Sequence, residues 1–354
     1  MAKSAVRAAL LLLATCSDLL ASPPAVTTPE ANMLLIHGAA VRAKDSGELP
    51  TDATAVARQV QQQLDLSRQL GSPRPLGEAR RVLDQLDQKL WQAQHWWLSA
   101  MVRQRLHDFD NAATDLFRAM SMTPNDPQLH FSAFSVAMAQ GKHEEAERYC
   151  RRFSQLSPGY LASACEAEWQ AATGNPERAR LGLRKAIADP ALQQDVVGFQ
   201  YAVATLAGLE AEYRPEQADR FWQLALTLDP DDIYSRSHYC QWLLEQQRLD
   251  DVIRYSNGYD SIDALAVVRV QALMSVDPDA AIALADKISA RIAQANWRRD
   301  WLHAYEYALF LLDVRPDPAA ALQMARRNWQ QQRRPEDAAL LARAQSAFSN
   351  MKEN

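Results

Sequence analysis

The chain has 354 residues, of which 48% are hydrophobic and only 11 are glycine, and its formal net charge is −5. This mild acidity, with no basic block, argues against nucleic acid as the main partner. Helix-forming residues dominate, and no stretch alternates apolar and polar residues as a strand would, so we predict an all-α fold. The chain is too long for one compact core of ordinary size, but its length suits a solenoid.

Residues 1–22 have the pattern of a signal peptide. Two basic residues precede a short apolar run at 8–14, which is too short to span a bilayer, and small residues follow. We favour ordinary signal cleavage. A lipoprotein signal ending at Cys16 is the alternative, although Thr15 departs from that pattern, and an uncleaved start is a third. Export predicts a periplasmic or secreted protein, or an outer-membrane lipoprotein.

Residues 23–50 are rich in Pro, Thr, Ala and Gly and predict a flexible arm. Residues 51–92 predict a divergent N-terminal helical repeat. Its first helix is expected at 53–70, after a good N-cap, and its second at 76–90. A turn rich in Gly and Pro separates the two helices.

A repeat with a period of about 34 residues follows. Ala112 and Ala146 are 34 residues apart, Ala179 and Ala218 recur at the same place in the pattern, and Val252 falls 34 residues after Ala218. A period of this length indicates a stack of helix pairs that bury their apolar faces on one another. Small residues suit the places where paired helices cross closely, and proline suits the end of a second helix.

These units resemble the tetratricopeptide repeat. The matching residues are Trp96, Ala100, Phe109, Ala112, Ala119 and Pro124 in the first unit, and Ala202, Ala218, Trp222, Ala225 and Pro230 in the fourth. The resemblance implies a right-handed superhelical solenoid of antiparallel helix pairs. We expect well-formed units over 93–232, degenerate units over 233–334, and a C-terminal capping helix and tail over 335–354.

The combination of an export signal, a Gly–x–Pro–Arg corner at 71–74 and a cysteine pair is similar to exported proteobacterial tetratricopeptide proteins of unestablished role. Cys150 lies eight residues before Pro158, and Cys165 lies seven after it. Antiparallel helices joined at that turn would place the two cysteines side by side. We therefore favour a disulfide, which suits an oxidising compartment, over two buried thiols. Cys240 is expected in the core.

The resemblance also implies which positions face the concave groove. They are Trp97, Met101, Gln104, Arg105, Phe131, Ser135 and Met138 in the first two units, followed by an acidic half that includes Glu168, Glu210 and Glu245. For Trp97 a place in the core is an equal alternative. A groove rich in Met and aromatic residues suits an apolar peptide. Arg333–Arg334 and two similar pairs make the last unit basic, either as a solvated face or as a patch for an acidic partner or lipid headgroups.

Nothing in the sequence forms a catalytic or cofactor motif. His107 and His143 lie on successive corners, about 10 Å apart, which is too far to share a metal. We predict a non-enzymatic interaction and scaffold module, without cofactor, that binds a peptide or protein partner in its groove. The alternative is an accessory subunit of an envelope complex for polymer or metal handling, attached to the membrane only through a lipid on Cys16. An enzyme is the third alternative.

Overall fold

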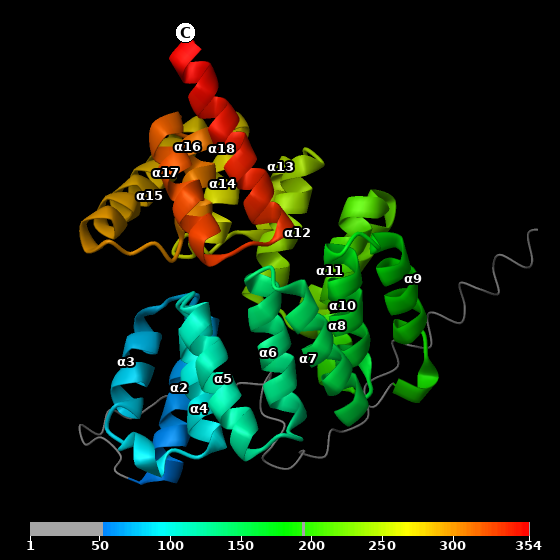
Figure 1. Ribbon diagram of the computed structural model, residues 1–354. Coiled ribbons are helices and arrows are strands. Elements are labelled where there is room, and N and C mark those ends of the chain that lie inside the picture. The colour runs from blue at the N-terminus through cyan, green and yellow to red at the C-terminus, as the bar shows by residue number, and fades with distance from the viewer. Residues whose placement is uncertain (1–51, 193–194, 354) are drawn as a thin grey trace, which may run out of the picture. The chain divides into compact units, whose positions relative to one another are not determined.

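The computed structural model describes residues 52–192 and 195–353, and all regular structure in these two segments is helical (Figure 1). The prediction of an all-α solenoid is confirmed. None of the helices described is long and apolar enough to cross a membrane. The predictions for the signal peptide at 1–22, for the arm at 23–50 and for lipidation of Cys16 lie outside the described residues.

The first helix pair consists of α2 (Ala53–Leu70) and α3 (Arg74–Leu83). The Asp52 carboxylate accepts a hydrogen bond from the Ala55 amide and caps α2, which has the predicted bounds. Helix α3 begins at residue 74 rather than at the predicted residue 76, and it ends at residue 83 rather than at residue 90. Asp87 accepts a hydrogen bond from the Lys89 amide and starts a separate turn, η2 (Gln88–Leu90), because a short polar side chain competes for backbone donors.

Four antiparallel pairs follow, joined by short corners. They are α4 (Ala93–Arg105) with α5 (Phe109–Met122), α6 (Pro127–Ala139) with α7 (His143–Leu156), α8 (Tyr160–Ala172) with α9 (Pro176–Ile187), and α10 (Val196–Tyr213) with α11 (Pro215–Leu228). The turn η3 (Pro190–Leu192) follows α9. The repeated alanines Ala112, Ala146, Ala179 and Ala218 are all at most 1% exposed. Their small side chains let the paired helices approach closely, as the period predicts.

The later helices are less regular. They are α12 (Ile233–Glu245), α13 (Leu249–Tyr255), α14 (Asp263–Val276), α15 (Pro278–Arg298), α16 (Ala304–Asp313), α17 (Pro318–Gln331) and α18 (Pro335–Glu353). Helix α13 is short because the Ser256 hydroxyl bonds back to the Val252 carbonyl at 2.6 Å and Gly258 then turns with a φ of 85°. Helix α18 begins at the proline that the sequence indicated.

The cysteines lie where the turn at Pro158 predicts. Cys150 of α7 and Cys165 of α8 form a disulfide, with their Cα atoms 5.9 Å apart. The bond joins the second helix of one pair to the first helix of the next. Cys240 of α12 is a buried free thiol that packs in the core beside Trp222 and Tyr239. The predicted disulfide and the predicted core position are both confirmed.

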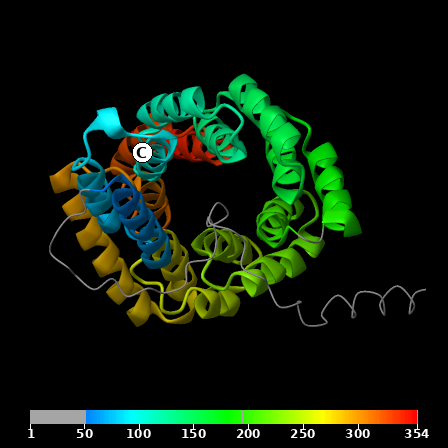
Figure 2. The same ribbon diagram turned by 90° about the horizontal axis from the view of Figure 1, so that it is seen from below.

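The pairs also make contacts with pairs distant in sequence. At the end of α2, Arg68 lies 3.4 Å from the Asp229 carboxylate, although 161 residues separate them. The next turn packs on Ile262 so closely that a Cβ on Gly71 would come within 2.7 Å of its side chain. In Figure 2 the helices of the described segments follow one another in chain order along a curved path, not along a straight row. The stack therefore departs from a row in which each unit contacts only its neighbours.

Candidate functional site

The first helices of consecutive pairs, α4, α6, α8, α10 and α12, lie next to one another in chain order, and we call them the inner row. Polar contacts join each helix to one of its neighbours. They are Trp97–Ser132 at 3.0 Å, Gln104–Ser135 at 3.3 Å, Glu168–Thr205 at 3.2 Å and Gln200–Asp232 at 3.5 Å. Because these contacts fix the spacing of the helices, the inner row is a preformed surface.

Trp97 belongs to the interior of the inner row. Its side chain is buried, with 7% exposed, and its indole Nε1 donates to the Ser132 hydroxyl, which in turn lies 3.8 Å from the Met101 sulfur. A tryptophan with its polar atom satisfied and its ring buried serves packing. The structure therefore favours the core interpretation of Trp97 over a place on an open groove. Met101 is half-buried beside it.

The other predicted groove residues divide into three sets. Gln104 and Ser135 bond to each other and are half-buried. Arg105 is exposed and faces the charges of Arg68 and Asp65 on α2. Phe131 and Met138 are half-buried against the core of the second pair. In the third set, Phe131 contacts a later helix of the inner row, α10.

Phe131 begins a surface that continues along the inner row. Its ring centroid lies 5.5 Å from that of Tyr201, edge to face. The Glu168 carboxylate of α8 accepts a hydrogen bond from the Thr205 hydroxyl at 3.2 Å, and Tyr201 lies one turn before Thr205 on α10. Tyr234 on α12 is 52% exposed, and its ring lies 4.1 Å from that of His238. We call Glu168, Tyr201 and Tyr234 the aromatic–acidic surface.

Electrostatics distinguish this surface from an ordinary solvated face. Burial raises the pKa of Glu168, although the hydrogen bond from Tyr201, the charge of Arg334 and Thr205 all act to lower it. The groups on this surface are therefore partly shielded from water, and an opposite charge brought to them interacts strongly.

Sequence reasoning found Glu168 but missed both tyrosines. Tyr234 is the second residue of α12, and neither it nor Tyr201 is among the groove residues that the resemblance implied. The Tyr201 ring reaches the inner row because it packs against Phe131 of a preceding pair, which no spacing within one unit reveals.

The segment 332–334 between α17 and α18, which we call the C-terminal corner, packs on the earlier corners. The Arg333 amide donates to the Ala139 carbonyl at the end of α6, at 2.8 Å. The Gln332 amide nitrogen lies 3.4 Å from His107 Nδ1. Gly141 has a φ of +68°, and a Cβ there would come 3.3 Å from both Cβ and the carbonyl oxygen of Arg333. Glycine therefore serves both the turn and the close approach.

Arg334 is the last residue of this corner and is held by residues at the start of α18. Its amide donates to the Asp337 carboxylate at 2.8 Å, and its guanidinium lies 3.9 Å from Glu336. The charges of Tyr234, Glu336 and Glu168 raise the pKa of Arg334 even though desolvation, the largest influence, lowers it. The Arg334 side chain is 39% exposed, so this arginine of the basic last unit remains partly in contact with water.

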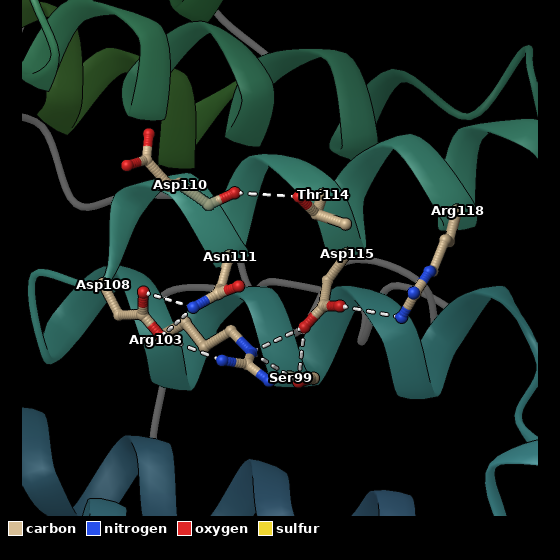
Figure 3. Close-up of polar contacts among 8 residues, drawn as sticks. All are labelled: Ser99, Arg103, Asp108, Asp110, Asn111, Thr114, Asp115 and Arg118. Atoms are coloured by element: carbon tan, nitrogen blue, oxygen red, sulfur yellow. Dashed lines mark hydrogen bonds and ion pairs between the residues drawn. The ribbon is translucent and has the colours of Figure 1, made fainter.

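A second polar cluster lies between α4 and α5 and holds the pair together (Figure 3). The Asp115 carboxylate, 5% exposed, accepts from the Ser99 hydroxyl at 2.7 Å and from Arg103 Nε at 2.8 Å. Arg103 also bonds to Asp108 at 2.8 Å, and Arg118 lies 3.6 Å from Asp115. Both oxygens of the Asp115 carboxylate have partners inside this cluster, so we assign it to packing of the pair.

The structure also bears on metals and cavities. In residues 52–192 and 195–353, no three His, Cys, Asp or Glu side chains gather closely enough to hold a metal ion.

An open cavity of about 510 Å³ lies between α17 and α18 and is lined by Arg326, Arg327, Gln330 and Phe348, among others. It is separate from the aromatic–acidic surface, whose residues do not line it.

No family model matches the chain, and no curated protein matches it in sequence. Among solved structures it is similar to Pseudomonas aeruginosa PilF, with 12% identity and a TM-score of 0.42 over 56% of this chain and 90% of that one. It is also similar to the APC/C hetero-tetramer Cut9–Hcn1, with 15% identity and a TM-score of 0.41 over 83% of this chain and 49% of that one. A third is the tetratricopeptide domain of P58(IPK), with 15% identity and a TM-score of 0.22 over 83% and 99%.

The chain spans about half the length of the Cut9–Hcn1 chain that it matches. All three TM-scores lie below 0.5, so these structures do not classify the chain. Its class follows instead from the arrangement of its own helices. Its tandem antiparallel pairs, with buried alanines at the crossings, form a tetratricopeptide-like solenoid. A fold of this kind suits a protein–protein interaction scaffold.

Proposed function

We propose that this protein is an interaction module that binds a peptide or protein segment on the inner row, across α6, α8, α10 and α12. The observation that carries the proposal is that Phe131 contacts Tyr201, and that Glu168, Tyr201 and Tyr234 lie on the neighbouring inner-row helices α8, α10 and α12. Aromatic rings supply contact area with little loss of side-chain entropy, and a preformed surface needs little ordering on association. These properties support binding in preference to catalysis.

The compartment is part of the same proposal. An exported location is supported by the signal-like pattern of the first 22 residues and by the disulfide, which persists in oxidising environments. The lipid-anchored alternative depends on Cys16. Metabolic labelling with a radioactive fatty acid separates the two, because only an anchored protein would carry the label.

The test is recovery of the native partner by affinity-tagged variants from the cell envelope of the source organism. Tyr234→Ala removes a ring that is half exposed, so the core stays intact. Truncating an aromatic residue at the centre of an interface costs about 2 kcal/mol, which weakens binding roughly thirtyfold. We expect the partner to be lost from this variant.

The matched control is Phe117→Ala. Phe117 is 68% exposed, but it lies on α5, which is a second helix and not part of the inner row. This variant should recover the partner as well as the unaltered protein does. Equal recovery by the Tyr234 and Phe117 variants would show that the inner row is not the binding surface.

A further inference from the structure

We propose that the cavity between α17 and α18 is a second binding site, which takes an acidic peptide segment that also carries an apolar side chain. We call this site the C-terminal groove. It is lined by Leu322, Gln323, Arg326, Arg327 and Gln330 of α17 and by Phe348 of α18. The groove lies outside the inner row, so this inference does not depend on the function proposed above.

The groove follows one face of α17. Its lining residues on this helix begin at Ala319, end at Gln330 and recur every three or four residues, so they share one stripe of the helix surface. The rise between the two end residues is about 16 Å, which about five residues of an extended peptide would span. Such an elongated site fits a peptide segment better than a compact ion.

The charge of the groove is positive. Helix α17 contains Arg326 and Arg327 but no acidic residue, and none of the residues that line the groove is acidic. In the described segments neither guanidinium takes part in an ion pair or a hydrogen bond, and the Arg327 Nε has no acceptor. Two guanidinium groups are therefore available to carboxylates, which they match in charge and in geometry.

The net charge of −5 belongs to the chain as a whole and does not oppose this assignment. Salt screens charges that are more than about 8 Å apart at physiological ionic strength, so the arginines at the groove dominate the field there.

Aromatic rings hold two cationic groups beside the groove. The Arg327 Cζ atom lies 3.6 Å from the centroid of the Trp301 ring, and the Lys352 Nζ atom lies 4.5 Å from that of Phe348. A cation–π contact restrains a charged side chain without neutralising its charge. Arg327 therefore loses little freedom when a carboxylate binds, and Lys352 adds positive charge near the apolar wall.

Leu322 and Phe348 make the apolar wall of the groove. Leu322 is 5% exposed, and Phe348 is half-buried. A purely apolar segment would remove water from the two arginines without supplying a counter-charge, which is costly. A lipid bilayer binds side chains that project into it, and Leu322 does not project. A segment with both carboxylates and a narrow apolar side chain therefore fits best.

The experiment measures fluorescence anisotropy with a labelled peptide in which glutamate alternates with leucine. In a second peptide glutamine replaces glutamate, and in a third serine replaces leucine. The unaltered protein should bind the first peptide about tenfold more tightly than either of the others, because each of these lacks one of the two kinds of contact.

Arg326→Gln should bind the glutamate–leucine peptide about tenfold more weakly, and it leaves the core intact because Arg326 is exposed. Phe348→Ala should weaken binding of the glutamate–leucine peptide but not of the glutamate–serine peptide, which makes no use of the apolar wall. Circular dichroism of each variant confirms that the helices are retained.

Arg298→Gln is the matched control. Arg298 is an exposed residue of α15 that does not line the groove, and its replacement changes the net charge by the same amount. This variant should bind the peptide as the unaltered protein does. The proposal is overturned if Arg326→Gln binds as tightly as the unaltered protein, or if Arg298→Gln weakens binding equally.

Sedimentation with phosphatidylglycerol vesicles tests the lipid alternative. Vesicle binding that requires Arg326, in a protein that does not bind the glutamate–leucine peptide, would assign the groove to a membrane surface and overturn the proposal. Tyr234→Ala should leave binding of the peptide unchanged. The C-terminal groove and the inner row can therefore be accepted or rejected independently.

Discussion

Asp115 is the residue on which the packing of α4 against α5 most depends. It is 5% exposed and binds Ser99 and Arg103, which both lie on the opposite helix. Asp115→Ala leaves these donors without their acceptor, so we expect a loss of about 2–4 kcal/mol in the free energy of unfolding. Urea denaturation followed by circular dichroism measures this change.

Asp110→Ala is the control for that experiment. Its carboxylate is 90% exposed, accepts a hydrogen bond from the Gln140 side chain at 2.7 Å and lies 3.9 Å from Lys142, so the free energy of unfolding should change by less than about 1 kcal/mol. If both variants lose the same stability, the cluster of Figure 3 does not hold the pair together.

The sequence predicts those inner-row residues whose place follows from their position within a repeat. It does not predict contacts between residues that are far apart along the chain. Phe131, Met138 and Glu168 occupy positions that the resemblance to the tetratricopeptide repeat assigns to the groove, so the repeat and that resemblance together place them. The contacts of Gln332 with His107 span 225 residues and belong to no period. Trp97 illustrates a third case, in which the position was predicted but its burial depends on Ser132 of the next unit.

Among the elements, α7 and α8 are the two that are covalently joined. The disulfide between Cys150 and Cys165 closes a loop with a sequence separation of 15 residues. Such a cross-link restricts the unfolded chain and stabilises the folded one by about 3 kcal/mol in the chain-entropy description. We expect Cys150→Ala/Cys165→Ala to lower the free energy of unfolding by roughly this amount.

Urea denaturation with and without a reductant checks that expectation. Reduction should destabilise the unaltered protein and leave the double variant unchanged. Cys240→Ala, which removes a buried thiol outside the disulfide, should remain sensitive to reduction. A midpoint that does not respond to reductant in the unaltered protein would contradict the assigned role of the bond.

The helices were predictable where caps and apolar spacing agree, as in α2, which Asp52 caps at its predicted start. They were less predictable where side chains compete for the backbone. Asp87 ends the regular part of the first repeat early, and Ser256 with Gly258 shortens α13. Because such competition is local and weak, the apolar spacing does not reveal it, and helix ends predicted from that spacing lie too far along the chain.

For the whole molecule, His107 links the position of the C-terminal corner to pH. Burial, followed by the charges of His303 and Arg334, lowers the pKa of His107 to about 4. Away from the corner a histidine titrates near 6.5. With the C-terminal corner packed in place, His107 therefore binds fewer protons than when the corner is released. The stability of the packed corner is complete above about pH 6.5 and decreases as the pH falls toward 4.

We expect acidification to release the corner, because a protonated Nδ1 cannot accept the hydrogen bond from Gln332. Hydrogen exchange of the segment around Arg333, corrected for the intrinsic effect of pH, should show protection falling between pH 6.5 and 4. His107→Asn is the control, since asparagine does not titrate and tolerates the φ of 58° at this position. An identical pH dependence in both proteins would exclude His107 as the cause.

The contacts of α2 with Asp229 and Ile262, together with that of Arg333 with Ala139, have a kinetic consequence. A row of units that contact only their neighbours can nucleate anywhere and fray from either end. Here the first and last pairs are tied to units far along the chain. Contacts of such separation form late and slow the overall reaction, because a long segment must be ordered before they are made. Single pairs should therefore form quickly, while completion of the molecule awaits the joining of its distant parts.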